Sequence, residues 1–434
     1  MAEMPSSNPQ TWALSVELIR HIGLLLLPEE PCVNSPVKST VNFHSPDFAE
    51  NNRTLNALTY TCRTTRGLLE PLLFRFIFMS NTADITHYFL LFARNPGLRS
   101  FTRHIACLSS LQWIDEEIPA ESRAWKIWKA RCGPDATGQD VLEDAGFQLD
   151  YDLATEGNPK VVTNITQSFY YDGFLRFMFC CVLLMLPETD TLFFHQELVI
   201  EGTESIGGMF EAMKEEGYSV TPRLRVMELG THEADQTSDL MELFFGDNGL
   251  WTNLETLVLN NTDFDNEFFQ ILEDGLFKAS MSVQELYIRG PGAVLDPEWE
   301  ITAVEQWAMM NLDHPPPHTA FCHLHLLDID FSPSAIRARD GSRSLKMFIS
   351  TIGGAPETLR LTRHPFPTAA LSQAIHTRLK VLVLNECTDM PEAMSDGQMR
   401  TAVAALTRRG KFCLPNLEWI EVNGFRKGRE ELGL

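Results

Sequence analysis

The chain has 434 residues, of which 44% are hydrophobic and 21% charged, a composition typical of a soluble protein that can bury a large core. Its formal net charge of −23 argues against a nucleic-acid partner, because an acidic surface repels a phosphate backbone. Nine cysteines without regular spacing, and no charged-then-apolar leader, predict a cytoplasmic or nuclear protein that is not secreted. The most apolar run, Phe177 to Leu186, is shorter than the roughly 20 residues of a membrane span. We therefore expect a buried core helix there and no membrane partner.

Helical periodicity is clearest near the N-terminus. Residues 1–10 are polar and aperiodic, which predicts a disordered tail. From Ala13 to Leu27 apolar residues recur at helical spacing, and Pro28 ends the pattern. Residues 28–54 predict a loop, after which Thr54 is a candidate N-cap for a second helix, and a third helix begins near Thr64. Residues 11–80 are therefore expected to form a small helical module with a loop insertion at 28–54.

Across residues 81–434, short strands alternate with helix-like stretches. Eight segments approximate the apolar pattern L-x-x-L-x-L, in which a period of two places the last two apolar side chains on one face of a strand. The middle apolar residues of these segments are Leu192, Met227, Leu257, Leu286, Leu327, Leu359, Leu382 and Ile420. The steps between them are 35, 30, 29, 41, 32, 23 and 38 residues, and a weaker segment runs from Arg103 to Cys107. Helices are expected between the strands, for example at 265–276, 298–310, 344–352 and 398–408.

This alternation has two interpretations. A strand and a helix every few tens of residues predict an α/β leucine-rich-repeat solenoid, a curved parallel sheet with helices on its convex side. A doubly wound α/β domain has the same local order of elements and is the competing fold. The stretch from about 115 to 168 fits no repeat. Between Asp115 and Glu156 eleven acids stand against four bases, which indicates an acidic surface insertion.

The N-terminal helices resemble a known module. The segments at 13–22, 58–63 and 73–77 read ALSVELIRHI, LTYTCR and LFRFI, and together they are similar to an F-box. The whole chain resembles the F-box/leucine-rich-repeat proteins of filamentous fungi. This resemblance implies a substrate receptor of the ubiquitin-conjugation pathway, which recruits the Skp-type adaptor of a cullin ligase through its F-box. The residues that the resemblance assigns to adaptor binding are Leu14, Glu17, Leu18, Ile19, Ile22, Leu58, Cys62, Arg63 and Phe74. The alternative is a leucine-rich-repeat scaffold in which a degenerate F-box serves only as an N-terminal cap.

Motifs for chemistry are few. The sequence contains no phosphate-binding glycine loop, no nucleophile elbow and no H-E-x-x-H zinc motif. The one tight Cys/His cluster, Cys322-His323-Leu324-His325, lacks the further ligands that a zinc site needs. We therefore expect no enzyme activity, no cofactor and no metal.

A binding surface is the better-supported expectation. In each strand the residues that alternate with the inward leucines should face outward on the concave side. These outward residues mix aromatic side chains, arginines and acids, a composition found in interface hot spots. The residues predicted to bind an unidentified target protein are Glu228, Asn260, Tyr287, Arg289, Asp328, Asp330, Arg360, Asn385, Trp419 and Glu421.

Overall fold

The structure, a computed structural model, describes residues 14–27, 46–108, 171–196, 223–231, 244, 253–260, 283–289, 323–330, 356–363, 378–387 and 416–432. The chain divides into two compact units, Met1–Ile77 with Phe101–Arg103, and Phe78–Ser100 with His104–Leu434. The tail expected at 1–10, the insertion expected at about 115–168 and the helices expected at 265–276, 298–310, 344–352 and 398–408 lie outside the described residues.

Three helices form the first unit: α1 (Val16–Leu25), α2 (Pro46–Thr59) and α3 (Arg63–Leu73). Helix α1 begins where the Ser15 hydroxyl accepts a hydrogen bond from the Leu18 backbone N–H at 3.2 Å, a typical N-cap. Helices α2 and α3 meet in a core of Leu55, Leu69 and Leu72, with further leucines packed around it. Gly23 brings α1 close to α3, because a Cβ atom at this position would lie 2.5 Å from Leu69 Cδ2.

The predicted boundary of the second helix is wrong. Helix α2 begins at Pro46, so residues 46–54 of the expected loop are helical, and the rest of that loop lies outside the described residues. Pro46 and Asp47 suit a first helical turn, where proline loses no hydrogen bond and an acid faces the positive end of the helix dipole. The first half of α2 has no clear helical periodicity in the sequence, because two half-buried asparagines, Asn51 and Asn52, interrupt the apolar side of the helix.

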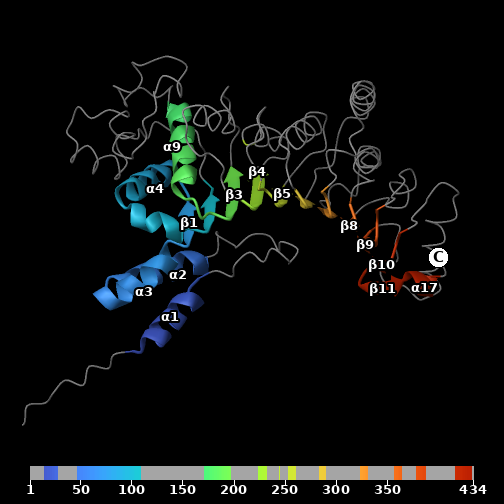
Figure 1. The fold of residues 1–434 in the computed structure, drawn as a ribbon, viewed down its shortest axis with the longest axis horizontal. Coiled ribbons are helices and arrows are strands. Elements are labelled where there is room, and N and C mark those ends of the chain that lie inside the picture. The colour runs from blue at the N-terminus through green and yellow to red at the C-terminus, as the bar shows by residue number, and fades with distance from the viewer. Residues whose placement is uncertain are drawn as a thin grey trace, which may run out of the picture. The chain divides into compact units, whose positions relative to one another are not determined.

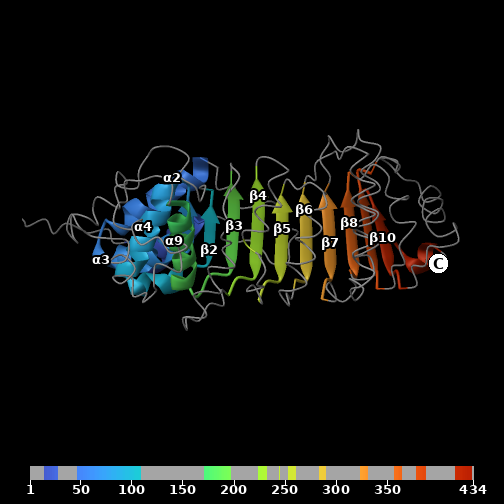
Figure 2. The same cartoon turned by 90° about the horizontal axis from the view of Figure 1, so that it is seen from above.

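Strands β2 to β11 belong to the second unit, and β1 spans the boundary at Ile77. Together they form an eleven-stranded sheet among the described residues, in chain order from β1 to β11. Strands β2 to β10 are parallel, and Figure 2 shows them side by side with their arrowheads pointing the same way. The strands are β1 (Phe76–Met79), β2 (His104–Cys107), β3 (Thr191–Gln196), β4 (Val226–Thr231), β5 (Thr256–Asn260), β6 (Glu285–Arg289), β7 (Leu326–Asp330), β8 (Thr358–Thr362), β9 (Val381–Asn385), β10 (Trp419–Val422) and β11 (Phe425–Gly428).

Strand order separates the two folds considered above. A doubly wound sheet reverses its strand order at a switch point, whereas this sheet never does. The mostly parallel open α/β sheet is therefore confirmed and the doubly wound alternative is wrong. All nine predicted strands are present, from β2 to β10, but the sequence-based prediction missed β1 and β11.

The register of the sheet aligns the apolar residues into two rows on one face. The first row is Ile105, Leu192, Met227, Leu257, Leu286, Leu327, Leu359, Leu382 and Ile420, which pair one with the next across the strands. The second row lies two residues further along each strand, from Cys107 to Val422. No residue of either row is more than 1% exposed. These rows form the core.

Two helices lie beside the first strands of the sheet, α4 (Thr82–Arg94) and α9 (Tyr171–Met185), and they pack against each other (Figure 1). The Phe179 ring of α9 meets the Phe194 ring of β3 edge to face at 5.8 Å, so α9 covers the face that carries the apolar rows. Met178 to Val182 are at most 2% exposed, which confirms the predicted buried core helix. A 3-10 helix (Pro96–Phe101) and a short helix α17 (Arg429–Leu432) complete the described elements.

Candidate functional site: the polar face of the sheet

The opposite face of the sheet carries the residues that were predicted to bind a target. Because side chains alternate along a strand, residues between the apolar rows point away from α9. Register places Glu228, Val258, Tyr287, Asp328, Arg360, Val383 and Glu421 in one row across β4 to β10. A neighbouring row contains Asn260, Arg289, Asp330, Thr362 and Asn385. With Trp419 two residues before Glu421, all ten predicted residues share this surface, which we call the polar face.

Exposure on the polar face is uneven. Glu228, Tyr287 and Asp328 are only 0%, 2% and 4% exposed, although the prediction treated them as solvent-facing. The side chains of Arg289 and Arg360 are 25% and 33% exposed. Arginines are thus the accessible charges around Asp328, while the carboxylate lies beneath them.

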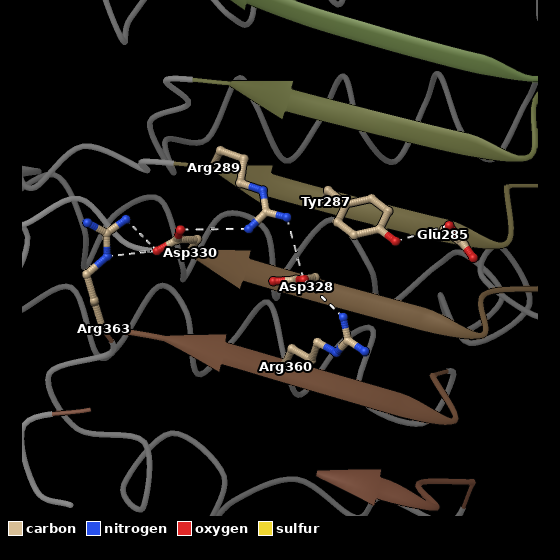
Figure 3. A network of polar contacts seen from close by, with 7 residues as sticks. All are labelled: Glu285, Tyr287, Arg289, Asp328, Asp330, Arg360 and Arg363. Atoms are coloured by element: carbon tan, nitrogen blue, oxygen red, sulfur yellow. Dashed lines mark hydrogen bonds and ion pairs between the residues drawn. The ribbon is translucent and has the colours of Figure 1, made fainter. Parts of the chain in front are cut away.

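A network of charges spans β6, β7 and the end of β8 (Figure 3). Asp328 Oδ2 lies 3.6 Å from Arg289 NH2 and 3.9 Å from Arg360 NH1, so both guanidinium groups approach one carboxylate oxygen. Arg289 NH1 is also 3.7 Å from Asp330 Oδ2. On the other side of Asp330, Arg363 donates from Nε and NH2 to Oδ1 at 2.9 and 2.6 Å.

Burial decides the ionisation of Asp328. Loss of water around the carboxyl raises its pKa above the usual range, and the attraction of Arg289 and Arg360 offsets only part of this effect. An ionised Asp328 is therefore costly in the folded protein and depends on the two arginines.

Tyr287 lies along its own strand, β6, between Glu285 and Arg289 (Figure 3). Its hydroxyl donates to Glu285 Oε2 at 3.1 Å, and Arg289 stands over its ring at 5.4 Å from the centroid. Burial raises the pKa of Tyr287 well above its ordinary value, and the neighbouring Glu285 carboxylate adds to the rise. The hydroxyl therefore remains a neutral donor that holds Glu285.

A second polar cluster lies on β3 to β5. Glu228 Oε1 is 3.1 Å from His195 Nε2 and also accepts a hydrogen bond from the Asn260 amide. Glu228 Oε2 is buried and has no hydrogen-bond partner among the described residues. Gly230 separates His195 from Asn260 in the register and leaves room for the imidazole ring to reach Glu228.

The sequence-based list missed several residues of these clusters. His195, Glu285 and Arg363 contact predicted site residues but were not predicted themselves. Strand alternation does place Glu285 on the outward side of β6, although it was not among the residues predicted to bind the target, and His195 occupies an outward position of β3 that the same alternation could have found. Arg363 follows the end of β8 with a positive φ of 58°, a conformation that strand periodicity does not signal.

Near β10 the polar face carries the aromatic side chain of Trp419. The Arg426 guanidinium of β11 lies 3.7 Å from the centre of the half-buried Trp419 ring. Asn385 ends β9, and its carbonyl oxygen accepts a hydrogen bond from Arg363 N–H at 2.8 Å. Both predicted residues therefore lie on the surface but have contacts within the chain.

The residues assigned to adaptor binding divide into two groups. Leu14, Glu17, Leu18, Cys62 and Arg63 are exposed, and Leu14 and Leu18 have exposed fractions of 56% and 44%. Ile19, Ile22, Leu58 and Phe74 are half-buried, and Ile19 and Leu58 pack against the core of their own unit.

Cys62 has a structural role. Its sulfur caps α3 by accepting a hydrogen bond from Thr65 N–H at 3.4 Å. The hydrogen bonds from Thr65 lower the pKa of this exposed thiol.

Within the described segments, no group of three or more His, Cys, Asp or Glu side chains is placed to hold a metal ion. None of the helices in those segments has both the length and the apolar character needed to cross a membrane. In comparisons with protein-family models and with curated proteins, the chain has no match.

Proposed function

We propose that this chain is a non-catalytic receptor, which recruits a Skp-type adaptor through α1 to α3 and holds a target protein on the polar face. In this proposal the sheet is a leucine-rich-repeat solenoid and the helical unit is an F-box. The aligned apolar rows, with one strand in every 23 to 41 residues from β3 to β10, support the first part.

The observation that carries adaptor binding is an exposed apolar stripe that begins at Leu14, just before the N-cap of α1, and continues along the helix. Leu14, Leu18 and Leu25 are 56%, 44% and 68% exposed, and half-buried Ile22 lies between them at helical spacing. Burying the exposed half of one such leucine against a partner contributes about 1 kcal/mol, because full burial of a leucine contributes about 1.5–3 kcal/mol. Contiguous exposed apolar side chains of this kind are typical of protein interaction sites.

The test is retention of the full chain on an immobilised Skp-type adaptor. We expect the wild type to bind, and the double variant Leu18→Asp/Leu25→Asp to bind at least about tenfold more weakly, because both substitutions place charge in the stripe. Phe425→Asp is the matched control, since Phe425 is 50% exposed on β11 and outside the stripe. It should bind like the wild type.

Failure of the wild type to bind, with its helical content intact, would remove the ligase role. The alternative would then be a scaffold protein whose N-terminal helices cap the repeats. Equal loss of binding in the Phe425→Asp control would also contradict the assignment of the stripe.

A further inference from the structure

Two arginines on the polar face have unused hydrogen-bonding capacity. Arg289 and Arg360 come from β6 and β8, and both reach over Asp328 on the strand between them (Figure 3). Their closest nitrogens stand 3.6 and 3.9 Å from Asp328 Oδ2, which is beyond hydrogen-bond distance. Neither guanidinium makes a hydrogen bond with any residue in the part of the chain that the structure describes.

Arg363, on the same surface, is an arginine that does make hydrogen bonds. It donates twice to Asp330 Oδ1, at 2.6 and 2.9 Å, from a side chain that is 30% exposed. Arg289 and Arg360 have similar exposure, 25% and 33%, but no such bonds. A guanidinium group has five N–H donors in a fixed planar fork, and no described residue accepts a hydrogen bond from any donor of this pair.

The exposed donors of the two arginines favour an anion. The cluster as a whole is formally neutral, with Arg289, Arg360 and Arg363 against Glu285, Asp328 and Asp330 (Figure 3). Arg363 is hydrogen-bonded to Asp330 and the Tyr287 hydroxyl to Glu285, whereas Arg289 and Arg360 lie 3.6 to 3.9 Å from Asp328 and Asp330. The Asp328 side chain is only 6% exposed, so the exposed groups that make no hydrogen bond with described residues are cationic. A basic ligand would have to displace these arginines, while an acidic ligand would add to them.

We propose that Arg289 and Arg360 form a receptor for a carboxylate side chain, presented by an acidic segment of a protein partner. Asp328 is the positioning residue, because it holds both guanidinium groups on one side of the sheet. This inference rests on the proposed function of the polar face and specifies the chemistry of the target. Arginine is suited to the role, since its planar fork can bind both oxygens of a carboxylate at once.

The experiment measures binding of fluorescent peptides to the full chain by anisotropy. Three probes of equal length alternate Ser with Glu, with Lys or with Gln. We expect the Glu peptide to bind and its affinity to fall as the salt concentration rises, whereas the Lys and Gln peptides do not bind. Arg289→Gln and Arg360→Gln should each weaken binding of the Glu peptide about tenfold, the loss expected for a charged hydrogen-bonded pair.

Two further variants make the result specific. Arg223→Gln removes the same charge from a side chain that is 68% exposed and pairs with Glu188, so it should bind the Glu peptide like the wild type. Asp328→Asn should bind the Glu peptide at least as tightly, because it keeps an oxygen acceptor for the arginines and removes a competing negative charge. Thermal unfolding of each variant verifies that the fold is intact.

Preferential binding of the Lys peptide, or equal weakening by Arg223→Gln, would overturn the inference. Binding of the Glu peptide that stays at the wild-type level in both Arg289→Gln and Arg360→Gln would overturn it too, since the arginines would then not contact the probe. So would a dimer of the wild type that Arg289→Gln dissolves, because the occupant would be a second copy. Retention on the adaptor is measured for the same variants, so that a failure here is distinguished from a failure of adaptor recruitment.

Discussion

At Gly230 the polar face has no side chain, and the His195 ring uses the space. A Cβ atom at this position would lie 3.0 Å from His195 Cε1 and 3.2 Å from Asn260 Cβ. We therefore expect Gly230→Ala to push the imidazole away from Glu228, whose buried carboxylate would lose one of its two donors. The predicted cost is about 1–2 kcal/mol of unfolding free energy, measured by denaturant titration.

Gly67 provides the matched control. It lies within α3, and a Cβ atom there would meet nothing within 4 Å. Gly67→Ala should therefore stabilise the chain by about 0.5–1 kcal/mol through the entropy of the unfolded state. If both variants lost stability alike, close packing at Gly230 would not be the cause.

Burial of Asp328 makes stability depend on pH in a definite direction. Its pKa is raised in the folded protein, so the ionised side chain costs free energy near neutral pH, and this cost disappears below the unfolded pKa. Asp328→Asn should therefore be more stable than the wild type at about pH 7, and the advantage should shrink toward about pH 4. The measurement is the difference in unfolding free energy between the two proteins across this range.

The pH dependence of stability that Glu357 contributes has the opposite direction. The hydrogen bond from Lys380, at 2.9 Å, lowers the pKa of Glu357, so its contribution is present above its usual pKa and is lost as the pH falls. Glu357→Gln should accordingly be less stable than the wild type near neutrality and should approach it in acid. The effect will be small, because the Lys380 and Glu357 side chains are 45% and 32% exposed and salt screens them.

At the scale of the elements, the β10–β11 hairpin adds an antiparallel strand at the edge of the sheet. Asn423 and Gly424 both have positive φ, 48° and 83°, which is the backbone of the tight hairpin turn that favours Asn-Gly. Gly424→Ala should cost about 1 kcal/mol in unfolding free energy, because an L side chain rarely adopts this conformation.

The cost at Gly424 can be assigned to the backbone alone. A Cβ atom would meet nothing within 4 Å either at Gly424 or at Gly97, but only Gly424 has a positive φ. Gly97→Ala should thus leave the unfolding midpoint nearly unchanged. A similar loss at both positions would rule out turn strain as the explanation.

Elements with a strong local pattern were predictable from the sequence, and those with a weak one were not. The L-x-x-L-x-L segments and the weaker segment at Arg103 to Cys107 predicted every strand from β2 to β10, because the two leucine rows place an apolar residue at every second position of each strand. Strand β1 was missed because Phe76 to Met79 are apolar at every position and follow a helix directly. Strand β11 was missed because Phe425, Arg426 and Lys427 have no apolar alternation, although the Asn-Gly pair before them is a hairpin signal.

The candidate site was only partly predictable for a different reason. Alternation correctly placed residues such as Asp328 and Arg360 on one face, since this depends only on strand register. Alternation could not predict how buried these residues are, because burial depends on the way in which long neighbouring side chains cover the sheet. Nor could it find Arg363, which reaches Asp330 from a residue outside the strand.

At the scale of the molecule, strands β2 to β10 each pair, among the described residues, with the strand before and the strand after them and with no other. Stability in such an array is close to a sum of local terms and nearest-neighbour terms. Leu361→Ala, at a fully buried position of β8, should cost about 2–5 kcal/mol locally. Native-state hydrogen exchange should then show protection lost in β7 to β9 before it is lost in β3. Uniform loss across all strands would mean that the sheet unfolds as one cooperative block.

Strand register in the sheet does not depend on the length of the connections. Leu359 pairs with Leu382 across 23 residues, and Leu286 pairs with Leu327 across 41 residues, yet both pairs lie in the same row. An engineer could therefore shorten or lengthen a connection without displacing the outward side chains of neighbouring strands. Conversely, those outward positions could be exchanged one by one to present a new surface while the leucine rows beneath them stay as they are.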